Sequence, residues 1–87
     1  MKVQSVYDDV SSNKNSRILN IFVLLSKGQR VSVVELANKY SVNARTIQRD
    51  ISDIKFFLAD YMVDTGECMT IEYDRIEKGY YMMKEIL

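Results

Sequence analysis

The sequence contains no histidine and a single cysteine, Cys68. One cysteine cannot form an internal disulfide, and the lack of histidine removes the most frequent general base and a frequent metal ligand. No serine, cysteine or lysine lies in a recognisable nucleophile motif. We therefore expect no enzymatic activity, no cofactor and no metal. A carboxylate-only site for magnesium or calcium stays open, although no calcium-loop spacing is found among Asp8, Asp9, Asp60, Asp64 and Asp74.

Long apolar runs are also lacking. The longest apolar clusters, Ile21–Leu25 and Tyr80–Met83, are far shorter than the roughly 20 residues that cross a bilayer. Residues 1–12 have no apolar core flanked by basic residues, as a secretory signal would. We therefore expect a cytoplasmic protein that is not inserted in a membrane. With 87 residues and 47% hydrophobic content, the chain can bury one modest core, which predicts a single domain.

The charge of the chain is balanced overall but uneven along its length. The formal net charge is zero, whereas proteins that bind nucleic acids usually carry a basic excess. Residues 12–58 hold eight basic and three acidic residues, an excess of five positive charges, and residues 59–74 hold five acidic residues and no basic one. Such asymmetry can orient a protein on an anionic surface, although ordinary scatter of surface charge explains it equally well.

The first half of the chain predicts two helices. Residues 1–12 are polar and weakly patterned, which indicates a flexible N-terminal extension before a domain at residues 13–87. A helix is expected from residues 13–15 to Gly28, because apolar residues recur at the i, i+3, i+4 and i+7 positions. Arg30 and Val31 then allow only a brief strand. Ser32 and Glu35 form a capping-box pattern for a second helix that ends near residue 40.

A tight turn of about three residues leads to a third helix, predicted at residues 44–58 with Asn43 as its cap. Two helices joined so closely cross steeply, which is the helix-turn-helix geometry. On a wheel of about 100° per residue, the apolar residues of the third helix fall within an arc of about 60°. These residues are Ile47, Ile51, Ile54 and Leu58. The opposite stripe contains no acid and holds Arg45, Gln48, Arg49 and Ser52.

The last third of the chain predicts a connector and a hairpin. Residues 60–67 are acidic and contain Gly66, which indicates a connector. Alternating residues from 71 to 74, a turn at 75–79 and β-formers from 80 to 83 predict a hairpin at about residues 70–83. Residues 84–87 could begin a further element. The expected fold is mainly α with a small β-hairpin, a winged helix-turn-helix with a three-helix core plus a wing.

The residues of the third helix suit DNA. An α-helix fits the major groove, where arginine pairs with guanine and glutamine with adenine through two hydrogen bonds each. Arg45, Gln48 and Arg49 are therefore expected to read bases, with Ser52 as a supplementary contact. Polar groups at helix starts and at the hairpin turn suit phosphates or a minor groove. The predicted DNA-binding residues are Ser32, Asn43, Arg45, Thr46, Gln48, Arg49, Ser52, Arg75 and Lys78. A polar outer face is also what any small helical domain shows.

Three stretches of the sequence, residues 17–25, 33–37 and 41–51, resemble the DeoR-type winged helix-turn-helix domain. That domain commonly forms the N-terminus of bacterial transcriptional regulators that carry a WYL ligand-sensing domain. The family pattern is met by Leu36-Ala37, Val42 and Arg45–Ile51, and the family's wing pattern by Ile71–Tyr80. The resemblance implies that the third helix enters the major groove of double-stranded DNA and that the hairpin is the wing.

The chain departs from the family pattern in three places. Asn43 stands where the family usually has serine, which preserves capping. Residues 59–69 are longer and more acidic than the family's usual connector. No WYL domain follows, so the chain is either a fragment that lacks a C-terminal ligand-sensing domain or a small stand-alone regulator.

We expect a homodimer, because winged-helix regulators usually read paired half-sites. Candidate interfaces are the N-terminal residues Val3, Val6 and Tyr7 and the aromatic-rich end at residues 80–83, although core packing is the simpler role for most of these tyrosines and methionines. The main alternative function is a winged-helix protein-protein interaction module. In that alternative, the third helix docks on another protein, and the chain needs no excess of basic residues.

Overall fold

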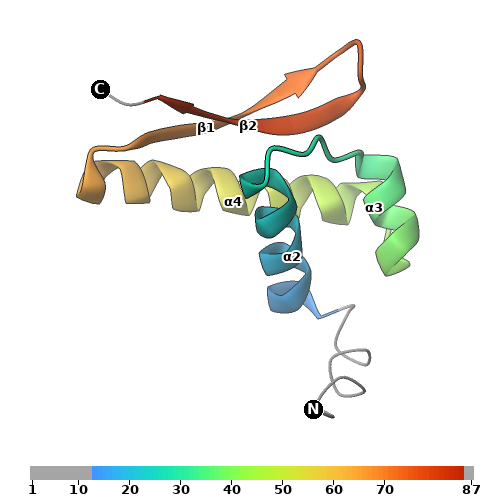
Figure 1. Ribbon diagram of the computed structural model, residues 1–87. Coiled ribbons are helices and arrows are strands. Elements are labelled where there is room, and N and C mark those ends of the chain that lie inside the picture. The colour runs from blue at the N-terminus through green and yellow to red at the C-terminus, as the bar shows by residue number, and fades with distance from the viewer. Residues whose placement is uncertain (1–12, 86–87) are drawn as a thin grey trace, which may run out of the picture.

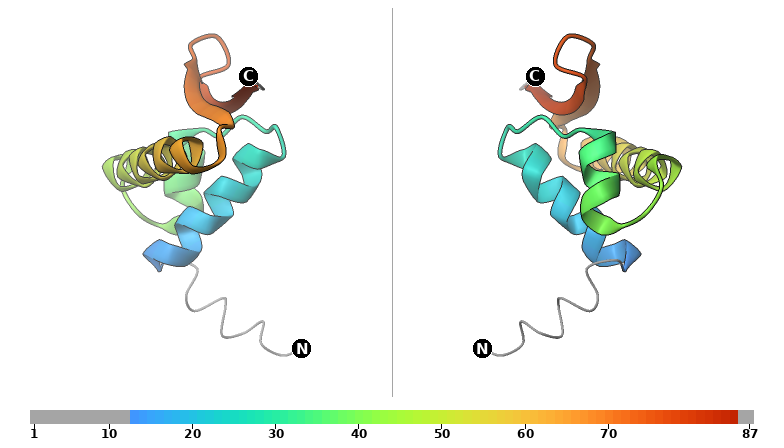
Figure 2. Two further views of the ribbon diagram at one scale, coloured as in Figure 1. Left: turned by 90° about the vertical axis from the view of Figure 1, so that its left-hand side faces the viewer. Right: turned by 90° about the vertical axis from the view of Figure 1, so that its right-hand side faces the viewer.

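Helix α4 runs through the middle of the molecule, with the hairpin along one side and α2 descending on the other (Figures 1 and 2). The computed structural model describes residues 13–85, so the predicted N-terminal extension lies outside the described residues. The elements in chain order are α2 (Lys14–Ser26), α3 (Val33–Tyr40), α4 (Ala44–Thr65), β1 (Cys68–Asp74) and β2 (Gly79–Glu85). Three helices and a two-stranded antiparallel hairpin form a winged helix-turn-helix, as the sequence predicts.

The starts of α2 and α3 are fixed by side-chain caps. The Asn13 Oδ1 accepts hydrogen bonds from the backbone N–H groups of Asn15 and Ser16, at 2.9 and 3.3 Å. The Ser32 Oγ accepts one from the Glu35 N–H at 3.2 Å. Each cap satisfies backbone donors that have no partner within the helix. Both helices therefore begin where the polar residues of the sequence predict.

Helix α4 is longer than predicted. The sequence predicts a helix at 44–58 followed by an acidic connector, but α4 continues to Thr65 and the connector shrinks to Gly66 and Glu67. Its last turns remain helical because Leu58 and Met62 keep facing β1, where both line a hollow beside that strand. Gly66 then ends the helix in the left-handed conformation, with φ 81°, and its N–H donates to the Met62 carbonyl at 2.8 Å.

The hairpin also extends beyond its predicted range of 70–83. The two strands pair antiparallel from Cys68 opposite Glu85 to Asp74 opposite Gly79. Residues 84 and 85 therefore continue β2 and begin no new element, while residues 86 and 87 lie outside the described part of the chain. The turn occupies residues 75–78, one residue fewer than the predicted 75–79, because Gly79 already pairs with Asp74 and begins β2.

The hairpin is joined to the helical body through the loop between α2 and α3. Val31 and Tyr80 exchange two backbone hydrogen bonds, of 2.9 and 2.8 Å, which confirms the brief strand expected there. Gly79 allows this approach, because a Cβ at that position would lie 3.1 Å from the Val31 carbonyl oxygen. The wing is therefore fixed against the body at the end near its turn.

The hydrophobic core lies between α4 and the other elements. All four residues of the predicted apolar stripe of α4 are buried and pack with Ile21 and Leu25 of α2, Leu36 of α3 and Ile71 of β1. Burial of each such side chain stabilises the fold by about 1.5–3 kcal/mol. Because the core occupies one face of α4, the opposite face is left to solvent.

Candidate nucleic-acid interface

The outward face of α4 carries the four residues that the sequence predicts for it. Arg45, Gln48, Arg49 and Ser52 are exposed. Among the described side chains, neither Arg45 nor Arg49 takes part in an ion pair. The long donors of this face are therefore available to an external ligand.

The start of α4 is organised by Asn43 and Thr46. The Asn43 Oδ1 accepts hydrogen bonds from both the backbone N–H and the hydroxyl of Thr46, at 2.9 and 3.0 Å. The hydroxyl hydrogen of Thr46 is thus used inside the protein. In the described part of the chain, the backbone N–H groups of Ala44 and Arg45 have no acceptor. These N–H groups, together with the helix dipole, favour an anion at this end of α4.

A groove of about 430 Å³ lies between the hairpin and the starts of α3 and α4. It brings together three predicted residues from three elements, namely Ser32, Gln48 and Lys78. Its other lining residues are Val33, Val34, Ala44, Tyr73 and Tyr80. Because the Ser32 oxygen accepts a bond from α3, its hydroxyl hydrogen can still be donated into the groove.

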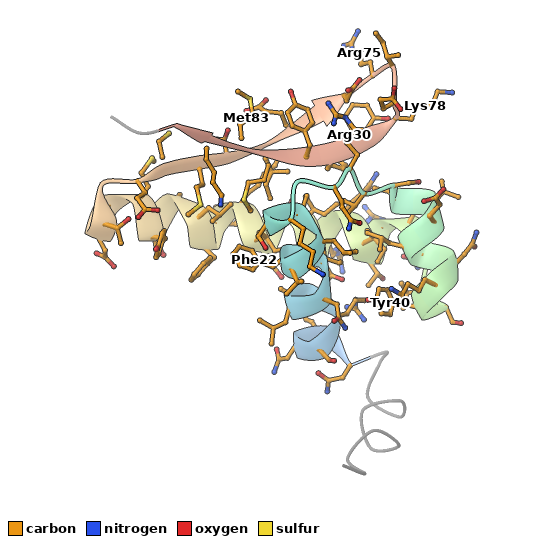
Figure 3. All side chains as sticks on the ribbon, in the orientation of Figure 1. Phe22, Arg30, Tyr40, Arg75, Lys78 and Met83 are labelled. Carbon is orange, nitrogen blue, oxygen red and sulfur yellow. The ribbon has the colours of Figure 1, made fainter. Side chains whose placement is uncertain are left out.

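The tip of the hairpin presents the two predicted wing residues. Arg75 and Lys78 are exposed and project from the turn (Figure 3). Lys78 adopts the left-handed conformation, with φ 56°. This backbone conformation is uncommon for lysine, and Lys78 is one of the residues that line the groove.

The wing turn is anchored by Arg30, a residue that the sequence did not assign to the site. The Arg30 Nε lies 2.9 Å from the Asp74 Oδ2, and its guanidinium lies 4.6 Å from the ring centroid of Tyr81. The Asp74 Oδ1 accepts hydrogen bonds from the N–H groups of Ile76 and Glu77, at 2.9 and 3.1 Å. The hydrogen bond from Glu77, and then that from Arg30, lower the pKa of Asp74. Arg30 is thus a positioning residue for the tip.

A buried ion pair between α2 and α4 was not predicted from the sequence, in which Arg17 is one of the eight basic residues of residues 12–58. Arg17 binds Asp50 through two nitrogens, with the Nη2 to Oδ1 bond at 3.2 Å. The hydrogen bond to Asp50 raises the pKa of Arg17. A signal was present, because Arg17 precedes the buried Ile21 and Leu25 at a spacing of four residues, on the inner face of α2.

The candidate dimer interfaces are only partly described. Tyr80 and Met82 pack against the core, as the simpler prediction has it, and Tyr81 lies under Arg30. Met83 is exposed. Val3, Val6 and Tyr7 lie outside the described residues.

Residues 13–85 contain neither a cluster of metal ligands nor a membrane-spanning helix. No group of three His, Cys, Asp or Glu residues lies close enough to hold a metal ion there. The helices in this range include none with the length and apolar content to cross a membrane.

Comparison with protein families gives one match. Residues 17–80 match a family model described as "HTH domain", for helix-turn-helix. The match covers α3 and α4 completely and extends from the buried Arg17 to Tyr80 at the wing. No curated protein and no solved structure matches the chain.

Proposed function

The chain belongs to the family of HTH domains, and on this basis we propose that it binds double-stranded DNA sequence-specifically, as the DNA-reading part of a bacterial transcriptional regulator of the DeoR type. The observation that carries the proposal is the outward face of α4. That face places Gln48 beside two arginines that form no ion pair within residues 13–85, next to a groove that Lys78 also lines.

Base reading is the role of the first half of α4. Arg45 to Ser52 span about 10 Å of helix, which suits the depth and curvature of the major groove. Arg45 and Arg49 donate two hydrogen bonds each to guanine, and Gln48 pairs with adenine. Ser52 is a supplementary contact. The acidic Asp60 and Asp64 lie on the later turns of α4, so they stay away from the duplex.

Phosphate binding is the role of the groove and the wing. A phosphate in the groove meets the Ser32 hydroxyl and the Lys78 ammonium, and the free N–H groups at the start of α4 lie beside it. Asn43 and Thr46 contribute by holding that helix start, because their side chains bind each other. Arg75 reaches the backbone or the adjacent minor groove. These contacts position the domain and carry no sequence information.

The active species in this proposal is a cytoplasmic homodimer. A single winged-helix domain buries too little DNA for strong selective binding, so two copies read paired half-sites.

The test is a selection of random duplexes by the purified protein, followed by affinity against salt for the best site and for a scrambled one. The proposal is supported if an inverted repeat is enriched and if the affinity for it falls steeply with salt concentration. The alternative, a protein-docking winged helix, is favoured by exposed apolar residues such as Leu19 and Phe56. No enrichment and no salt-sensitive binding would favour this alternative and reject DNA reading.

A further inference from the structure

The tip of the wing exposes an aliphatic side chain between two cations. Ile76 is 89% exposed, more than any other large hydrophobic residue that the structure describes. It lies between Arg75 and Lys78, which project from the same turn (Figure 3). This side chain gains little from packing within the described domain, so it is available to contact a bound duplex.

The turn holds the backbone of Ile76 in place. The Ile76 N–H donates to the Asp74 Oδ1 at 2.9 Å, and the Asp74 Oδ2 is bound by Arg30 at 2.9 Å. Behind the turn, the two hydrogen bonds between Val31 and Tyr80 fix the hairpin to the body. Since these contacts involve the Ile76 backbone and its neighbours, the Ile76 side chain itself is presented outward.

The tip lies beside the helix proposed to read bases. Lys78, two residues after Ile76, lines the same groove as Gln48 of α4. We propose that, with α4 in a major groove, the tip lies over the neighbouring minor groove, and that Ile76 enters this groove and makes the base pair beneath it a specificity position that prefers A·T over G·C. This inference rests on the proposed DNA-binding function.

The preference follows from the chemistry of the groove floor. In the minor groove A·T and T·A present only acceptors, whereas G·C adds the guanine N2 amino group. An aliphatic side chain over that amino group removes it from water without offering an acceptor, which is unfavourable. The flanking Arg75 and Lys78 bind the phosphates that border the groove, so the preference belongs to Ile76. The turn carries these two cations against one acid, Glu77.

The test replaces single base pairs flanking the selected site with G·C or with inosine·C. Inosine lacks the N2 amino group but keeps the major-groove edge of guanine, so only a minor-groove reader treats I·C like A·T. We expect the parent protein to bind G·C about tenfold more weakly than A·T or I·C at one flanking position, in the range of a single mismatch. In Ile76→Ala this difference falls below about twofold, while selection by α4 is unchanged.

Val63→Ala is the matched control, because Val63 is a branched aliphatic residue that is 81% exposed on the distal part of α4. Val63→Ala should keep the parental preference for A·T or I·C over G·C. Thermal unfolding checks that both variants remain folded. If Ile76→Ala keeps the parental discrimination, or if the parent shows none at any flanking position, the inference is overturned while base reading by α4 stands. If the parent selects no duplex, the proposed function fails as well.

Discussion

Arg17 of α2 and Asp50 of α4 form an ion pair inside the core, where the two residues are only 5% and 1% exposed. Asp50 directly follows Arg49, one of the proposed base-reading residues. The pair therefore fixes both the crossing of α2 over α4 and the rotation of α4 about its own axis. Together with the buried apolar stripe of α4, this contact orients the side chains that face outward.

Loss of one partner of this pair should destabilise the protein strongly. Arg17→Met or Asp50→Leu leaves an uncompensated charge in the core, which costs about 3–5 kcal/mol, while the double variant recovers much of that loss. Urea unfolding measures the free energy of each variant. The exposed pair Lys14 and Asp53, at 3.1 Å between Nζ and Oδ2, is the matched control, for which we expect only about 0–1 kcal/mol. If removing one partner lowers the free energy of unfolding equally for the two pairs, burial of the Arg17–Asp50 pair does not matter and the prediction is wrong.

Local features of the sequence predicted most of the fold. The caps Asn13, Ser32 and Asn43, each a polar residue before a periodic segment, lie where the helices begin. The spacing of the apolar residues of α4 identified its buried face, so the outward face with Arg45 and Arg49 followed. These features depend on residues within one helical turn of each other, and a single sequence contains them.

The features that the sequence did not predict depend on contacts between distant segments. The end of α4 was misplaced because acidic residues resemble a loop, whereas Met62 remains helical by facing β1. The Arg17–Asp50 pair joins residues 33 positions apart, and the Arg30–Asp74 pair joins residues 44 positions apart. Such pairings require knowledge of which faces meet. The base-reading residues were therefore predictable as one face of α4, whereas the Arg17–Asp50 and Arg30–Asp74 pairs that support the site were not.

The wing turn should titrate at acidic pH. Because the pKa of Asp74 is lowered, its stabilising contacts are complete above the ordinary aspartate value of about 3.9 and are lost as the pH falls through the lowered value. The amide resonances of Ile76 and Glu77, whose N–H groups bind Asp74, should report this midpoint in NMR spectra.

Arg30→Gln should move the Asp74 midpoint upward but not to its ordinary value, because the Glu77 N–H has the larger effect on that pKa. Lys27→Gln, a change at an exposed cation on the same loop, should leave the midpoint unchanged. A midpoint at or above the ordinary value in the parent protein would show that the anchoring of the turn described here is wrong.

Arginines of α4 and of the wing should differ in how their loss affects DNA binding. Arg45→Ala should weaken the best site by about 1–3 kcal/mol and relax the selection at one base pair. Arg75→Ala should weaken all duplexes alike and reduce the salt slope by about one. Lys84→Ala, which removes a cation at the opposite end of the hairpin, is the control and should change neither quantity. Equal loss of selectivity in Arg45→Ala and Arg75→Ala would refute this division of roles.

The lysine at position 78 is expected to lower the stability of the fold and to raise the affinity for DNA. Its left-handed backbone, with φ 56°, favours glycine, so Lys78→Gly should raise the free energy of unfolding by about 0.5–1 kcal/mol. The same change removes the ammonium group from the groove shared with Ser32 and Gln48, so affinity for every duplex should fall.

Ser41→Gly provides the comparison, because Ser41 has the same φ of 56° but lies in the turn between α3 and α4, outside that groove. It should be stabilised to a similar extent and keep the parental affinity. Urea unfolding and binding titrations of the two glycine variants therefore separate relief of backbone strain from loss of a phosphate contact. If Lys78→Gly binds DNA as tightly as Ser41→Gly, Lys78 does not contact the duplex and the wing tip must be placed elsewhere.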